Sequence, residues 1–177
     1  MTKMSLVAAL VLASTTTYAQ TEADIELNDN KVAIAFASTI GENATGSFGF
    51  RYNENTGKSL FAELSMAHKA NKHQFDIGIR ATQFWNRLVD NGSTASIVLG
   101  YSYPFTKELS WYAHGLYTPS VLAFGSIDRH HELGSRLQYQ FSPKMAVFAG
   151  YRNTQLKVNQ TNYEFDDNWF IGANIRF

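Results

Sequence analysis

The 177-residue sequence has no cysteine, only 3 prolines and no excess of either charge sign. Without cysteine an exported chain has no disulfides to stabilise it, and it cannot be a lipoprotein acylated on cysteine. Its 15 basic and 15 acidic residues give a formal net charge of zero. A chain without a basic field is a poor binder of nucleic acid, which is held largely through its phosphate backbone.

The sequence also lacks an apolar run of the roughly 20 residues that a membrane-spanning helix needs. The one apolar stretch, Met4–Ala13, is about half that length, follows Lys3 and precedes the small residues of Thr17-Tyr18-Ala19. This order is typical of a secretory signal peptide, whereas a transmembrane anchor would need a longer run. We therefore predict a signal peptide over 1–19, cleaved before Gln20, and one domain over 20–177.

Aromatic residues are abundant, with 13 Phe, 9 Tyr and 3 Trp, and after residue 22 the apolar positions recur every second residue. This period predicts strands, and helical periodicity is absent. Ten segments show it: Ala23–Asn28, Lys31–Thr39, Ser47–Tyr52, Leu60–Ala67, Phe75–Trp85, Ala95–Tyr103, Leu109–Tyr117, Glu132–Phe141, Met145–Arg152 and Trp169–Phe177. The expected fold is all-β, a transmembrane antiparallel up-and-down β-barrel of 8–10 strands. The count is eight if the short first two segments do not span.

The segments between the predicted strands differ in length. Pro104–Lys107 and Ser142–Lys144 are short, as periplasmic turns are, while three longer polar segments suit extracellular loops. These are Asn86–Thr94, Thr118–Ser126 and Asn153–Asp167.

The polar face of the strands distinguishes a membrane barrel from a soluble, lipocalin-like one. It is rich in Gly, Ser and Ala and carries few charged residues, whereas a face in water would carry about 25–35% charged residues. A narrow lumen suits such a face, with Arg and carboxylate groups neutralising each other. The predicted lumen charge network consists of Glu63, Asp76, Arg80, Glu132, Arg136, Arg152 and Arg176. Aromatic residues near strand ends on the opposite face suit interfacial girdles.

The last predicted strand has an apolar face that ends on the final residue. A terminal Phe on such a strand resembles the signal read by the outer-membrane barrel-assembly machinery, so we expect this machinery to be a partner during biogenesis. The residues of this predicted assembly signal are Trp169, Ile171, Ala173, Ile175 and Phe177.

Histidine suggests two sites that we expect not to be functional. His130-His131-Glu132 places two groups on one face of a strand, but a metal site would need a third ligand. His114 shares a face with Ser110, as in a Ser-His-acid hydrolase, but the His-x-Ser-Asn run of outer-membrane lipid hydrolases is missing. We therefore predict no catalytic, cofactor-binding or metal-binding residue.

Three segments of the C-terminal half form a recognisable pattern: Tyr117–Gly125, which reads Tyr-Thr-Pro-Ser-Val-Leu-Ala-Phe-Gly, Val147–Arg152 and the closing strand to Phe177. With these segments the C-terminal half resembles the YfaZ family of outer-membrane proteins. The resemblance implies a small outer-membrane barrel and no particular activity.

The expected function is that of an integral outer-membrane barrel of Gram-negative type, with a structural or surface-interaction role and a mostly filled polar lumen. The alternatives are a narrow channel for a small solute and a lipid-modifying enzyme; a general porin would be longer. Outer-membrane lipid is the other expected partner, with no nucleic acid, and the protein is expected to be monomeric.

Overall fold

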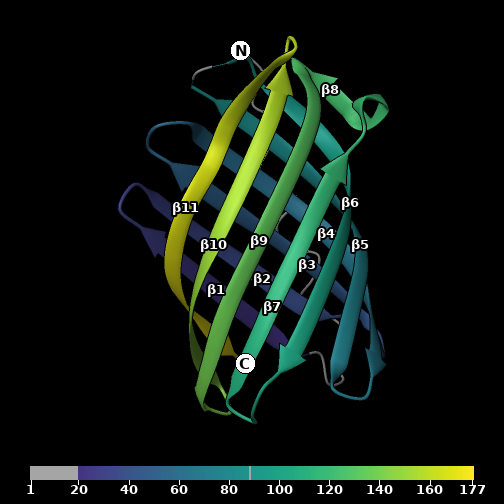
Figure 1. The fold of residues 1–177 in the computed structure, drawn as a ribbon, viewed down its shortest axis with the longest axis vertical. Coiled ribbons are helices and arrows are strands. Elements are labelled where there is room, and N and C mark those ends of the chain that lie inside the picture. Colours follow the sequence, from purple (N-terminus) through teal and green to yellow (C-terminus); the bar gives the residue numbers. More distant parts are fainter. Residues whose placement is uncertain (1–19, 88) are drawn as a thin grey trace, which may run out of the picture.

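The structure is a computed structural model that describes residues 20–87 and 89–177, so the predicted signal peptide, residues 1–19, lies outside the described residues. An antiparallel sheet curls round and closes on itself (Figure 1). Its strands are β1 (Thr21–Asn28), β2 (Lys31–Thr39), β3 (Ala44–Asn53), β4 (Gly57–Ala70), β5 (His73–Asn86), β6 (Gly92–Pro104), β7 (Leu109–Thr118), β8 (Ala123–Gly125), β9 (Ile127–Ser142), β10 (Met145–Val158) and β11 (Thr161–Arg176). A short 3₁₀ turn, η1 (Ser120–Leu122), precedes β8. In the described part of the chain, no helix has the length and hydrophobicity needed to cross a membrane.

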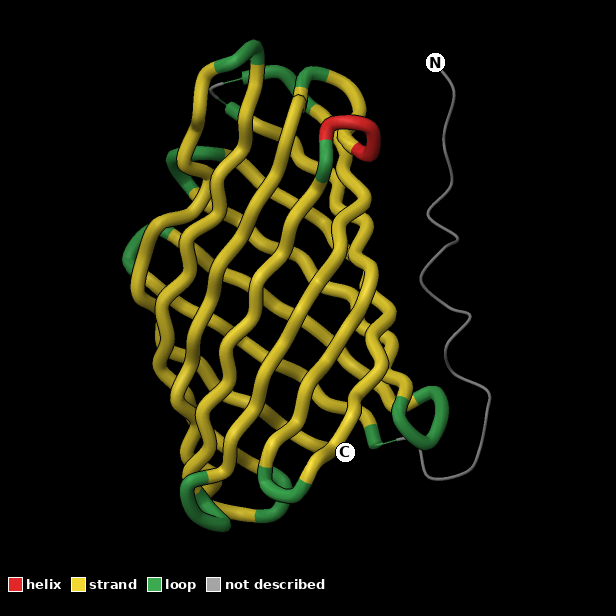
Figure 2. The backbone as a smooth tube through the Cα atoms, turned by 45° about the vertical axis from the view of Figure 1, so that its right-hand side comes forward, coloured by secondary structure: helices red, strands yellow, loops and turns green. Residues whose placement is uncertain are grey.

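Ten of these strands form the barrel wall, each paired with its neighbour in sequence (Figure 2). The wall closes where β1 pairs with β11, from Glu22 opposite Arg176 to Leu27 opposite Ile171. The three-residue β8 adds only to the upper end of β6. Both short N-terminal strands are therefore part of the wall, and the count is ten rather than eight.

The alternation of side chains is that of a membrane barrel. Large apolar residues face outward and are strongly exposed, among them Ile79, Leu99 and Leu133, which are 64%, 59% and 66% exposed. Small, polar and charged residues alternate with them and face the interior. The closed sheet pairs its backbone groups between strands, and the alternation of side chains presents a hydrocarbon surface to lipid.

The two rims of the barrel differ. One rim carries Thr21 and Phe177, joined by a backbone hydrogen bond of 2.9 Å, and short connections such as Pro143-Lys144. The opposite rim carries η1, β8 and residues 89–91, and there β9, β10 and β11 rise highest (Figure 1). We assign the first rim to the periplasm and the second to the cell exterior, as in bacterial barrels with an even strand number.

The prediction of a loop over Asn153–Asp167 was wrong. Strand β10 continues to Val158 and β11 begins at Thr161, so that only Asn159 and Gln160 form the turn, with φ of 49° and 67°. Two successive positive φ values are the geometry of a tight type I′ hairpin. A bulge in this extension, opposite Thr154 and Gln155, shifts the register between β10 and β11.

Candidate functional site

The main hydrogen-bond acceptor of the barrel interior is the carboxylate of Glu132 on β9, whose side chain is 1% exposed. The guanidinium of Arg51 on β3 donates to both of its oxygens, at 2.6 and 3.2 Å. Arg80 on β5 donates at 3.1 Å, His114 Nε2 on β7 at 3.0 Å and Thr154 Oγ1 on β10 at 2.9 Å. One carboxylate therefore ties together five strands from around the wall.

Acidic residues of β1 form a second set of ion pairs with arginines of the last three strands. Arg152 donates two hydrogen bonds to Glu26, at 2.8 and 2.9 Å, and Arg136 donates to Asp24 at 2.7 Å. Nearer the periplasmic rim, Arg176 Nε lies 3.6 Å from Glu22. These pairs lie beside the seam where the barrel closes, and paired, hydrogen-bonded charges can be accommodated in a low-dielectric interior.

The structure places all seven residues of the predicted network on the inner face. Glu63 accepts a hydrogen bond of 2.6 Å from Arg80, and Asp76 accepts one of 3.0 Å from Gln74. The prediction omitted four residues that carry much of the network: Glu22, Asp24, Glu26 and Arg51. A signal for them existed, because the acids of β1 alternate with Ala23, Ile25 and Leu27, and Arg51 stands between Phe50 and Tyr52.

Inward-facing aromatic rings separate the arginines. The Arg51 and Arg80 guanidinium carbons lie 5.1 and 4.7 Å from the centre of the Phe61 ring. Arg136 lies 4.8 Å from the Phe148 ring and Arg152 lies 4.8 Å from the Phe170 ring. These cation–π contacts fill the lumen with apolar bulk while the arginines stay paired.

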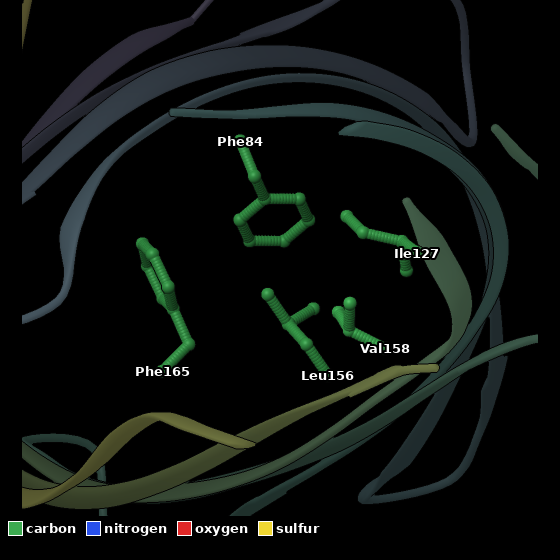
Figure 3. Packing of buried hydrophobic residues seen from close by; sticks show 5 residues of the cluster. All are labelled: Phe84, Ile127, Leu156, Val158 and Phe165. Atoms are coloured by element: carbon green, nitrogen blue, oxygen red, sulfur yellow. The ribbon is translucent and has the colours of Figure 1, made fainter. Parts of the chain in front are cut away.

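An apolar cluster lies at the extracellular end of the interior. It consists of Phe84, Ile127, Leu156, Val158 and Phe165, which are 1–6% exposed (Figure 3). The Phe84 ring meets the Phe165 ring edge-on, with centroids 5.1 Å apart, and the His130 ring at 5.0 Å. We call these five residues the apolar plug. Because the upper strands lie above the lipid belt, their apolar residues face inward and their polar residues outward.

The periplasmic half of the interior is less full. A cavity of about 350 Å³ lies there, reaching from the arginine layer to residues near the lower strand ends, including Glu22, Gln74 and Ser102. Tyr112, Asp76 and Arg136 also line it. We call this cavity the vestibule; it lies on the periplasmic side of the ion pairs and of the apolar plug.

The histidines occupy different surroundings. His130 faces inward at 1% exposure, with Nδ1 3.2 Å from Thr94 Oγ1, whereas His131 faces outward and lies 2.9 Å from Gln155. Residues 20–87 and 89–177 contain no group of three His, Cys, Asp or Glu arranged to hold a metal ion. The interior partner of His114 is Glu132, and within the same residues no hydroxyl group is hydrogen-bonded to its imidazole.

One glycine makes room for this histidine. Gly134 on β9 lies opposite His114 on β7, and a Cβ at Gly134 would overlap the imidazole ring. The absence of a side chain at this position therefore lets His114 reach Glu132.

The closing strand places Trp169, Ile171 and Phe177 on the outer face, 74%, 66% and 71% exposed. Ala173 and Ile175 alternate onto the same face, as predicted, while Asn174 and Arg176 face inward. Several aromatic residues of the outer wall lie near strand ends, namely Tyr101, Tyr103, Trp111, Tyr139 and Phe141 below and Tyr117 above, whereas Tyr151 and Trp169 lie in the middle of β10 and β11. Recognition of this strand during assembly stays a prediction.

Comparisons with known proteins give a family and a fold. The model of the YfaZ precursor family matches residues 1–177. No curated protein matches the chain. Among solved structures, the NanC porin is similar with a TM-score of 0.52 and 11% identity, covering 90% of this chain and 100% of that one. The KdgM porin gives a TM-score of 0.50 and 10% identity, covering 89% and 99%.

An anion-selective porin from Comamonas acidovorans is similar with a TM-score of 0.43 and 12% identity, covering 83% of this chain and 49% of that one. The description of the family as a precursor agrees with the predicted signal peptide, and the solved structures are outer-membrane barrels. The chain belongs to the YfaZ precursor family and is a small, porin-like β-barrel of the outer membrane.

Proposed function

We propose that this outer-membrane barrel is closed and has a structural or surface-interaction role. The observation that carries the proposal is the apolar plug above the Glu132 ion-pair layer. An ion crossing the barrel would have to lose its hydration among Phe84, Leu156 and Phe165, which offer it no polar partner. It would also have to displace a carboxylate that accepts five hydrogen bonds.

The size of the barrel supports the same conclusion. Small barrels of about eight strands leave room for little besides side chains, and wide aqueous channels belong to barrels of 16 or more strands. Here the interior side chains include Phe61, Phe148 and Phe170 besides the paired arginines. With a filled interior, the surfaces available for interaction with other molecules are the outer wall and the extracellular rim.

A narrow channel for a small solute is the second candidate. It is favoured by the 350 Å³ vestibule in the periplasmic part of the interior. The solved structures with this fold are named as porins, although a likeness at 10–11% identity supports the fold alone. For this candidate the plug would have to open.

Conductance in planar bilayers separates the two candidates. The closed barrel predicts no stable ion steps for the wild type, and steps that appear when Phe84→Ala and Leu156→Ala are combined. The matched control is Leu99→Ala with Leu133→Ala, which removes similar side chains from the lipid face. Stable wild-type steps whose ion selectivity changes with Arg136→Ala would favour the channel.

We also propose that the barrel is not an enzyme and acts as a monomer surrounded by lipid. The support for the first point is the position of His114, whose imidazole is hydrogen-bonded to Glu132 and to no hydroxyl group within the described residues. Turnover of phospholipid or lipid A that is lost in His114→Ala, but not in His131→Ala, would overturn it.

A further inference from the structure

Two basic and two aromatic side chains meet on the outer wall at the extracellular edge of the lipid-facing belt. Tyr52 on β3 lies opposite Lys58 on β4, and Lys58 lies opposite Trp85 on β5, so that the three form one row across adjacent strands. Arg87 follows the end of β5 and donates a hydrogen bond of 3.1 Å to the Tyr52 hydroxyl. All four residues are exposed.

The cations lie against the aromatic rings. The ammonium nitrogen of Lys58 is 5.7 Å from the centre of the Trp85 ring, and the Arg87 guanidinium carbon is 5.8 Å from the centre of the Tyr52 ring. Such contacts hold the two side chains along the wall. We call Tyr52, Lys58, Trp85 and Arg87 the basic–aromatic row.

The charges of this row are not neutralised by the protein. Arg87 Nη1 donates to the backbone carbonyl of Glu54 at 2.6 Å, but over residues 20–87 and 89–177 neither Lys58 nor Arg87 forms an ion pair with a carboxylate. The interior arginines differ, since Arg51, Arg80, Arg136 and Arg152 are all ion-paired there. Two positive charges therefore face the membrane boundary without a counter-charge.

The row continues a surface that already contacts lipid. Two residues further down the same strands and on the same outward face are Phe50 and Leu60, 37% and 46% exposed. Tyr and Trp side chains settle at the level of lipid headgroups, and basic side chains above them attract headgroup phosphates. Arg in particular binds phosphate through its planar set of donors.

We propose that the basic–aromatic row binds the phosphate of an outer-leaflet lipid, with the acyl chains of that lipid lying on the apolar wall below. Lys58 and Arg87 supply the charge, and Tyr52 and Trp85 hold them at headgroup level. This site lies on the outer wall, so it does not depend on whether the barrel interior is open or closed.

The test is binding of lipid A by the full-length mature barrel in uncharged detergent, measured by native mass spectrometry or by titration of a fluorescent analogue. The variant Lys58→Gln/Arg87→Gln is expected to bind about thirtyfold more weakly, since each basic group near an anionic lipid surface contributes about a factor of five. The control Lys107→Gln/Arg129→Gln removes the same charge elsewhere and should bind as the wild type. Lys58→Arg should also keep binding.

Three results would overturn the proposal. One is equal binding of lipid A and its fully dephosphorylated form by the wild type, which would indicate an apolar groove only. Another is equal weakening in the two double variants, which would indicate a diffuse charge effect. The third is displacement of lipid A by inorganic phosphate at similar concentration, which would indicate a general anion site. Heat-modifiable gel mobility checks that each variant is folded.

Discussion

Replacing Glu132 by alanine is the sharpest perturbation of the interior. Summing five hydrogen bonds to a buried carboxylate would overstate the effect, because one of the donors keeps another partner. Arg80 keeps Glu63, at 2.6 Å. Arg51 loses the one carboxylate within 4.0 Å of it among the described residues, so the variant leaves one buried, uncompensated cation. The expected loss of unfolding free energy is about 3–5 kcal/mol.

Urea unfolding in lipid vesicles, followed by tryptophan fluorescence, measures this loss. Glu164→Ala is the matched control, because Glu164 is an exposed acid on β11, and we expect this variant to lose about 0.5 kcal/mol of unfolding free energy or less. Adding Arg51→Met to Glu132→Ala should recover part of the loss, since it removes the unpaired charge. A Glu132→Ala variant as stable as the control would refute the role given to this carboxylate.

Three further predictions concern the wall, the closing strand and the His114 contact. Leu99→Arg should cost about 2–4 kcal/mol near the bilayer midplane, and Ser102→Arg, which enters the vestibule, clearly less; equal costs in vesicle unfolding would contradict the assignment of the faces. Deletion of Phe177 should lower the amount of heat-modifiable barrel in the outer membrane, and assembly at the wild-type level would remove the proposed signal. Gly134→Ala should push His114 away from Glu132 and cost about 1–3 kcal/mol, whereas Gly115→Ala, on the lipid face, should be nearly neutral by the same unfolding assay.

The alternation of residues predicted the membrane part of the fold well, because lipid outside and paired charges inside give each strand two distinct faces. It also predicted the inward direction of seven charged residues, such as Glu132 and Arg136. The alternation does not say which inward side chains meet across the barrel. The contacts of Arg51 and Arg80 with Glu132 on β9 depend on the curvature of the wall, so they could not be predicted from the sequence.

The region above the membrane could not be predicted in the same way. In the upper parts of β10 and β11 the apolar residues Leu156 and Phe165 face inward and polar residues face outward, so an apolar residue no longer marks the lipid side. The turn at Asn159-Gln160 lacks the glycine that usually marks a two-residue hairpin. Because of these two features, a continuous hairpin was predicted as a polar loop, and the apolar plug was not predicted.

Two-sided thiol labelling tests the closed interior most directly. The chain has no cysteine, so Ser102→Cys places a single thiol in the vestibule. In reconstituted vesicles of determined orientation, a charged, membrane-impermeant thiol reagent is added to one side at a time. A closed barrel predicts labelling from the periplasmic side alone. Labelling at similar rates from both sides would show that the apolar plug does not close the barrel.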